Sequence, residues 1–272
     1  MKKKLFYRER TWTCGHYKEI EIFPVYQKPG IRRSKCKPSS EIQKQLNDKH
    51  SKAHFKRLVH LNFTEGDCVI GLDYTEGCLP DNDDMAKRDA QNWVRRLRCL
   101  YKKLGSELKY IIVYERSDEG RPHFHALIND IGIEIKRLQQ LWTYGRTEVD
   151  SLQFDNSGVV GLSKYYSKGK LFYRRWSGSK NLKQPEPDDK DYKYTNKAIA
   201  ALKIEDPEEI RKIYGDGYIV NCEIRNNDIN RADYINIVIF DYVAFYNEVG
   251  KKAYQMIKKD KTTALTPARR VE

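Results

Sequence analysis

Alternation of polar and apolar residues predicts most of the regular structure of this chain. Residues 4–26 read as two strands around a turn at Cys14-Gly15-His16, and the second strand alternates through Glu19-Ile20-Glu21-Ile22-Phe23. An apolar run within Asp67–Tyr74 has the character of a buried strand. Apolar residues at helical spacing predict a long helix from about Asp83 to Leu104.

The same patterns assign the other elements. We expect a helix from Ser39 or Ser40 to about His60, strands at Tyr110–Glu115, His123–Ile128 and near Thr147–Val149, and helical segments near 133–142 and 160–169. Residues 174–195 are basic and polar, which predicts a loop, and they are followed by a helix near 194–214, strands at 217–225 and 234–240, and a helix to about Lys259. Short links between strands favour hairpins, and therefore an α+β fold with a central antiparallel sheet and helices packed on its faces.

Composition adds an anionic partner to this picture. The 272 residues carry a formal net charge of +13, and their Lys and Arg are interleaved with 19 Tyr, 9 Phe and 4 Trp. Cations beside stacking aromatics suit single-stranded nucleic acid better than an anionic membrane, because no basic amphipathic helix stands out. A basic protein that is merely soluble remains an alternative on charge alone.

Cysteines and hydropathy limit the class of protein further. The six Cys form no Cys-x-x-Cys pair, which argues against a zinc ribbon or a redox motif. The charged start Met1-Lys2-Lys3-Lys4-Leu5 precedes no long apolar run, and no stretch approaches a membrane-spanning length. We therefore expect a reduced protein of the cytoplasm that does not bind a membrane.

Two histidines and a glutamate form a candidate metal site. His123 and His125 point to one face of a strand, because side chains alternate with a period of two. A hairpin whose turn is centred on Glu119 places Glu115 opposite His123 and Val113 opposite His125. Two imidazoles and one carboxylate suit Mn²⁺ or Mg²⁺ and leave coordination positions for phosphate oxygens.

Other readings of these histidines fit less well. A bare His-x-His pair on an edge strand is more often solvated or packed than functional. Histidine-triad hydrolases require a third alternating His, but position 127 is Leu. Two-histidine phosphoesterases require two His-x-Thr or His-x-Ser motifs, which the chain lacks.

A candidate nucleophile follows in the segment Val160–Lys170. If this segment is helical, Tyr165 and Lys168 share one face, whereas Tyr166 lies with Leu162 on the core face. Tyr165 is then the better nucleophile, and Lys168 binds the scissile phosphate or stabilises the phenolate. Alternatively, both tyrosines simply pack or stack on nucleic acid.

Glu115, His123 and His125, followed by Tyr165-x-x-Lys168, resemble the motifs of the HUH endonucleases, specifically the rolling-circle replication initiator (Rep) proteins of phages and small plasmids. The likeness covers about residues 40–185 and includes the runs Asn62–Asp67, Lys164–Lys168 and Arg174–Leu182. It implies a central His-x-His strand, a tyrosine helix laid across the sheet, a covalent 5′-phosphotyrosine and a free 3′-hydroxyl.

Two departures from the family pattern stand out. The family's first core strand usually reads Leu-Thr-Leu-Thr-Tyr, whereas this chain has Ile70-Gly71-Leu72-Asp73-Tyr74. Some phage initiators carry two tyrosines four residues apart, but here Gly161 and Gly169 occupy the positions four residues from Tyr165. The sequence therefore predicts single-tyrosine chemistry, with termination by a second subunit or another nucleophile.

These observations predict an initiator that nicks and rejoins single-stranded or hairpin origin DNA. Residues 1–40 would form an N-terminal hairpin and linker, 41–185 the endonuclease core, 186–260 a C-terminal α/β extension packed on the core, and 261–272 a basic tail. The candidate DNA contacts are Lys164, Lys170, Arg174, Arg175 and Trp176. No Gly-x-x-x-x-Gly-Lys-Ser/Thr string occurs, so we expect a host helicase and single-strand-binding protein as partners in a bacterial cell. The alternatives are a relaxase or transposase of the same superfamily, and a DNA-binding module without cleavage activity.

Overall fold

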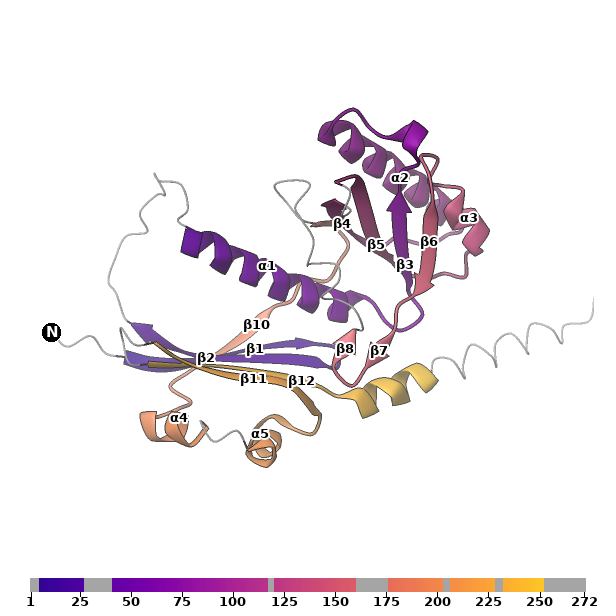
Figure 1. Ribbon diagram of the computed structural model, residues 1–272. Helices are drawn as coiled ribbons and strands as arrows, with labels where there is room; N and C mark the ends of the chain where they lie inside the picture. The colour runs from indigo at the N-terminus through magenta and orange to yellow at the C-terminus, as the bar shows by residue number, and fades with distance from the viewer. Residues whose placement is uncertain are drawn as a thin grey trace, which may run out of the picture. The chain divides into compact units, whose positions relative to one another are not determined.

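The computed structural model describes residues 5–26, 41–116, 120–159, 176–202, 206–227 and 232–251 (Figure 1). The chain divides into two compact units. Unit 1 comprises Met1–Pro29, Asn156–Gly158 and Pro187–Glu272, and unit 2 comprises Gly30–Asp155 and Val159–Glu186. Each unit is built on its own five-stranded sheet.

The sheet of unit 2 is antiparallel throughout, in the order β6-β3-β5-β4-β9. Its strands are β3 (Cys68–Asp73), β4 (Tyr110–Arg116), β5 (Pro122–Ile128), β6 (Thr147–Ser151) and β9 (Trp176–Gly178). The strand that carries His123 and His125 is central, and the predicted α+β class with an antiparallel sheet is confirmed.

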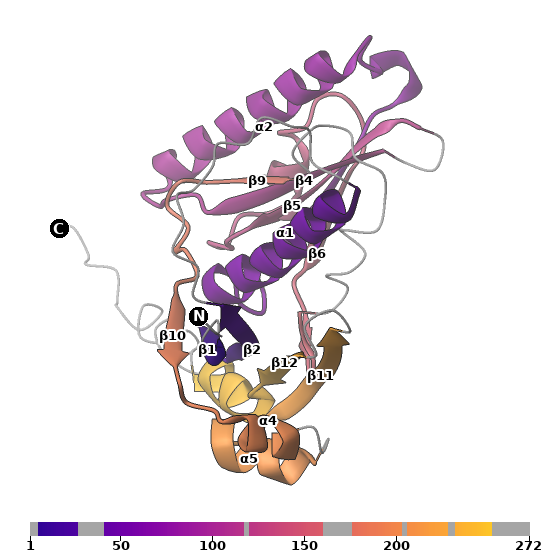
Figure 2. The same cartoon turned by 90° about the vertical axis from the view of Figure 1, so that its left-hand side faces the viewer.

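One face of this sheet is closed by α2 (Asp83–Lys103), which runs along the strands (Figure 2). Asn82 begins the helix, because its side chain accepts a hydrogen bond from the Met85 N–H. The buried residues of α2 recur at helical spacing: Ala86, Ala90, Trp93, Val94, Leu97, Leu100 and Tyr101. They pack on Ile70, Leu72, Ile112, Tyr114, Phe124, Ala126 and Ile128. Since these strand residues all have even numbers, the odd-numbered ones face the opposite side of the sheet.

Unit 2 also contains α1 (Glu41–Asn62), the 3-10 turn η1 (Glu76–Cys78) and the short helix α3 (Ile135–Gln139). A two-stranded ribbon joins β7 (Phe154–Asp155) and β8 (Gly158–Val159). The predicted helix near 133–142 is thus shorter in the structure, and the one near 160–169 lies outside the described residues.

The sheet of unit 1 has the order β10-β1-β2-β12-β11 and is also antiparallel. Its strands are β1 (Leu5–Cys14), β2 (Tyr17–Tyr26), β10 (Pro187–Asp191), β11 (Tyr218–Asn227) and β12 (Ala232–Phe240). Helices α4 (Asn196–Leu202) and α5 (Pro207–Tyr214) contribute Ile199, Leu202 and Ile210 to a core with Ile20, Ile22, Ile235, Ile237 and Ile239. Residues 242–251 form a further helix.

Three sequence expectations are corrected by the strand pairing. The polar pattern of residues 174–195 predicts a loop, but they contain β9 and β10. The single helix expected near 194–214 is two helices, α4 and α5. The sequence pattern assigns residues 1–40 and 186–260 to separate segments, yet β1 and β2 lie in one sheet with β10, β11 and β12.

Candidate active site

The candidate metal ligands lie on neighbouring strands in the predicted register. Glu115 on β4 pairs with His123 on β5, and Val113 pairs with His125. The face shared by these odd-numbered residues is the one that α2 leaves uncovered. The tip of the hairpin, residues 117–119, lies outside the described residues, but the pairing on either side fixes its register.

The three side chains converge within this face. The Nε2 atoms of His123 and His125 are 2.8 Å apart, and the two rings meet edge to face. The Nε2 atom of His125 is 3.7 Å from the Glu115 carboxylate, whose side chain is only 3% exposed. The two imidazoles are more accessible than the carboxylate, so the site opens toward solvent on the histidine side.

This donor set fits a divalent cation in chemistry. Ligand atoms bound at about 2.1 Å to one ion lie roughly 3–4 Å from each other, and the two separations given above are near that range. As they stand, no three His, Cys, Asp or Glu side chains in the described parts of the chain are spaced to hold a metal ion. Two imidazole nitrogens and a buried carboxylate are nevertheless the ligand types that Mn²⁺ accepts.

Asp73 is a site residue that the sequence analysis did not identify. It ends β3, pairs with His123 across β5, and its Oδ1 lies 2.5 Å from the His123 Nδ1. In the sequence, the run Ile70–Tyr74 shows only a departure from a family pattern. The pairing of β3 with β5, which joins residues about fifty positions apart, is what brings Asp73 to the histidine.

The residues predicted for the reaction with DNA fall mostly outside the described part of the chain. Tyr165 and Lys168, and the candidate DNA contacts Lys164, Lys170, Arg174 and Arg175, all lie within 160–175. Their positions relative to the histidines therefore stay predictions.

Trp176 is the predicted DNA contact that the structure does describe. On β9 it pairs with Val113, which places it in the same cross-strand row as His125 and Gly71. The rings of His54 and Phe55 on α1 lie against its indole, each with centroids 5.8 Å away. Burial, and then the positive charge of Arg57, lowers the pKa of His54.

A partly buried histidine holds the chain where it enters the predicted nucleophile segment. The Nδ1 of His60 is 2.8 Å from the Lys56 carbonyl oxygen, and its Nε2 accepts from the Val159 N–H at 3.3 Å. Burial lowers the pKa of His60 to about 4. A neutral imidazole with Nδ1 protonated satisfies both contacts, so His60 anchors the backbone six residues before Tyr165.

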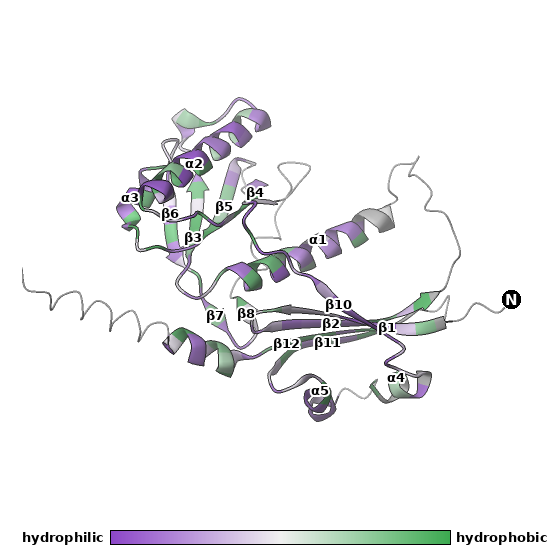
Figure 3. Ribbon diagram, turned by 180° about the vertical axis from the view of Figure 1, so that it is seen from behind, coloured by the Kyte–Doolittle hydropathy of each residue, from purple (hydrophilic) through white to green (hydrophobic). Residues whose placement is uncertain are grey.

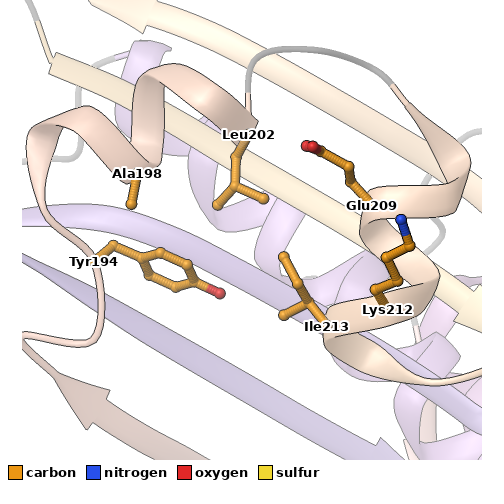
Figure 4. Close-up of a pocket in the computed structure, with 6 residues that line it drawn as sticks. All are labelled: Tyr194, Ala198, Leu202, Glu209, Lys212 and Ile213. Atoms are coloured by element: carbon orange, nitrogen blue, oxygen red, sulfur yellow. The ribbon is translucent and has the colours of Figure 1, made fainter.

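Unit 1 contains a pocket of about 320 Å³ between α4 and α5 (Figure 4). It is lined by Tyr194, Ala198, Leu202, Glu209, Lys212 and Ile213. Apolar side chains form most of the lining, and none of the residues predicted for the active site belongs to it. Among the described helices, none is long and apolar enough to cross a membrane.

Residues 67–170 match the sequence profile of a family of replication-associated proteins, the ORF2 type. The matched range begins just before β3 and includes Glu115, His123, His125, Tyr165 and Lys168. The match supports a role in the initiation of replication and the binding of DNA. No curated protein and no solved structure matches the chain.

Proposed function

We propose that this protein initiates rolling-circle replication by nicking and rejoining single-stranded or hairpin origin DNA. The observation that carries the proposal is the convergence of Glu115, His123 and His125 on one open sheet face, within the range that matches a replication-associated family. A cation of the Mn²⁺ or Mg²⁺ type, held by these three residues, would polarise the scissile phosphate.

The remaining chemistry belongs to side chains of the chain. The phenolic oxygen of Tyr165 attacks the phosphorus and loses its proton, while the bond to the 3′-oxygen breaks and that oxygen leaves as a hydroxyl. One phosphodiester is exchanged for another, so the 3′-hydroxyl can reverse the step without ATP. Lys168, one helical turn away in the predicted helix, offers positive charge to the phosphate or to the phenolate.

DNA would reach the site along the basic and aromatic segment that precedes and includes β9. Trp176 offers a ring on which a base can stack, in the row of His125. Lys164, Lys170, Arg174 and Arg175 would neutralise backbone phosphates. Unwinding would come from a host helicase with single-strand-binding protein, in the cytoplasm of a bacterial host.

An adduct assay tests the nucleophile. Because a 5′-phosphotyrosine retains the downstream fragment, a pool of single-stranded hairpin oligonucleotides labelled at the 3′ end should give a denaturant-resistant labelled protein in MnCl₂. We expect Tyr165→Phe to abolish this band and Tyr166→Phe, the matched control, to keep it. An adduct that survives in Tyr165→Phe would overturn the assignment of the nucleophile.

The same assay tests the metal site and separates an enzyme from a binding module. The combined variant His123→Ala and His125→Ala should form no adduct, and EDTA should have the same effect on the wild type. Undiminished cleavage by that variant would overturn the metal site. Retention of DNA without any adduct in the wild type would instead indicate a DNA-binding module.

A further inference from the structure

Asp73 contacts the histidine pair from the strand opposite Glu115. β3 and β4 flank β5, so the central His123 has Asp73 on one side and Glu115 on the other (Figure 1). Asp73 Oδ1 lies 2.5 Å from Nδ1 of His123, while Nε2 of the same ring faces His125. The two nitrogens of His123 therefore have different partners.

The chemistry of the carboxylate assigns the proton on that ring. An ionised carboxylate can only accept a hydrogen bond, so Nδ1 of His123 must carry the hydrogen. In the neutral imidazole, Nε2 is then a lone pair, which is the form that binds a cation. His125 Nε2, 2.8 Å away, donates the proton between the two rings in this state.

The backbone of Asp73 is fixed by residues that take no part in the donor set. Its carbonyl accepts a hydrogen bond of 2.8 Å from Trp142 Nε1, and its N–H donates to the Arg146 carbonyl at 3.0 Å. Gly145 packs so closely that a Cβ there would lie 2.3 Å from the Asp73 carbonyl oxygen. The carboxylate thus stands on a rigid support, and little conformational entropy is lost when it orients His123.

We propose that Asp73 is a positioning residue, which holds His123 with Nδ1 protonated and so sets the affinity of the site for a divalent cation. The inference rests on the metal site of the proposed function, but Asp73 itself touches neither DNA nor the reacting atoms. Residues that orient a metal-binding imidazole in this way typically contribute 10- to 100-fold in affinity.

Asp73→Asn is the decisive variant, because an amide has nearly the same shape but can offer its NH₂ group to Nδ1. Glu148→Gln is the matched control: it removes one negative charge from β6 on the same face, where Glu148 instead contacts Arg146 at 2.8 Å. Asp73→Ala, which lacks any acceptor, is the second variant, and thermal unfolding checks that all three fold.

The first measurement needs neither metal nor DNA. Long-range ¹H–¹⁵N spectra of the metal-free protein report which nitrogen of His123 is protonated. We expect a protonated Nδ1 and a free Nε2 in the wild type and in Glu148→Gln, and a mixture of both forms in Asp73→Asn and Asp73→Ala. The same protonation pattern in all four proteins would overturn the proposal.

The second measurement is Mn²⁺ binding, followed by the paramagnetic resonance of the free ion. We expect the dissociation constant to rise 10- to 100-fold in Asp73→Asn and to stay within about twofold in Glu148→Gln. Wild-type binding that Asp73→Asn leaves unchanged would contradict only the role of Asp73. A wild type that does not bind Mn²⁺ would contradict the metal site of the proposed function, whereas loss of the adduct assay alone would leave both results on Asp73 in force.

Discussion

Each of the two sheets buries one glutamate, and the neighbours of the two carboxylates differ in kind. In unit 1, Glu9 is 2% exposed and receives hydrogen bonds from Lys193, Tyr194 and Tyr214. In unit 2, Glu115 is equally buried but has an imidazole nitrogen of His125 at 3.7 Å. Lys and Tyr donors complete a carboxylate with protein hydrogens, whereas imidazole nitrogens are themselves cation ligands. The first arrangement stabilises a fold, and the second suits chemistry.

The electrostatics of the Glu9 cluster support this contrast. Burial alone would raise the pKa of Glu9, but the hydrogen bonds from Lys193, Tyr214 and Tyr194 outweigh it and hold the pKa below its ordinary value. Burial, together with the charge of Glu9, raises the pKa of Tyr194 and Tyr214 well above the ordinary value. These two tyrosines resist ionisation, so they are poor candidates for a phenolate nucleophile.

The largest difference between the two glutamates should appear in catalysis. Glu115→Gln removes a charged donor from the proposed metal site, so we expect the rate of adduct formation in MnCl₂ to fall at least ~100-fold. Glu9→Gln, the matched control in the other sheet, should retain a rate within about threefold of the wild type. Equal losses in the two variants would mean that the contrast between the glutamates is not functional.

The next effect is on stability and has the opposite pattern. Glu9→Gln leaves the Lys193 ammonium without its carboxylate partner, and breaking such a buried pair costs about 3 kcal/mol. Denaturant unfolding should therefore show a lower free energy of unfolding for Glu9→Gln. We expect Glu115→Gln to change it by less than about 1 kcal/mol. A larger destabilisation by Glu115→Gln would indicate that Glu115 is mainly structural.

Acid should distinguish the units by the pH at which each loses stability. His60 in unit 2 has a folded pKa of about 4 against an ordinary 6.5, so the unfolded state binds more protons between these values. Stability is then lost as pH falls from 6.5 to 4, and since the residue is not fully shielded from solvent we expect about 2 kcal/mol. Glu9 in unit 1 has a lowered pKa, so its contribution is present above 4.5 and is lost only as pH falls through the folded value.

Unfolding measured from pH 7 to pH 3 checks this order. His60→Gln should remove most of the dependence between pH 6.5 and 4, and Glu9→Gln should flatten the curve below 4.5. A wild type whose stability is constant down to pH 4 would contradict the assignment of His60 as a neutral imidazole.

What the sequence predicted well is local in the chain. The pairing of Glu115 with His123 follows from one hairpin, and α2 follows from apolar spacing and its cap. By contrast, β10 consists of exposed polar residues and has no apolar pattern (Figure 3). It becomes a strand by pairing with β1, where Arg8 and Arg10 form ion pairs with Asp191 and Asp189, some 180 residues away.

The same reasoning explains why Asp73 escapes a reading of the sequence. Asp73 belongs to the donor face only because β3 adds to β5, and a pattern within β3 cannot reveal its neighbour. The donors around Glu9 come from the segment 193–214, far from β1 in sequence. Alternation indicates which side chains share a face, but long-range pairing decides which of them meet.

The smallest expected effect concerns Gly71, the other residue of β3 that departs from the family pattern on this face. It pairs with His125, and an added Cβ would meet only the Glu148 Cβ, at an ordinary 3.7 Å. Gly71→Ala should therefore stabilise unit 2 by about 0.4–1 kcal/mol, because alanine restricts the unfolded chain more than glycine does. Mn²⁺ binding should not change, since a methyl group adds no donor and removes none. If adduct formation nevertheless falls more than about threefold while Mn²⁺ binding holds, the open space beside His125 is occupied by DNA, and the active face of unit 2 extends from the histidines toward β6.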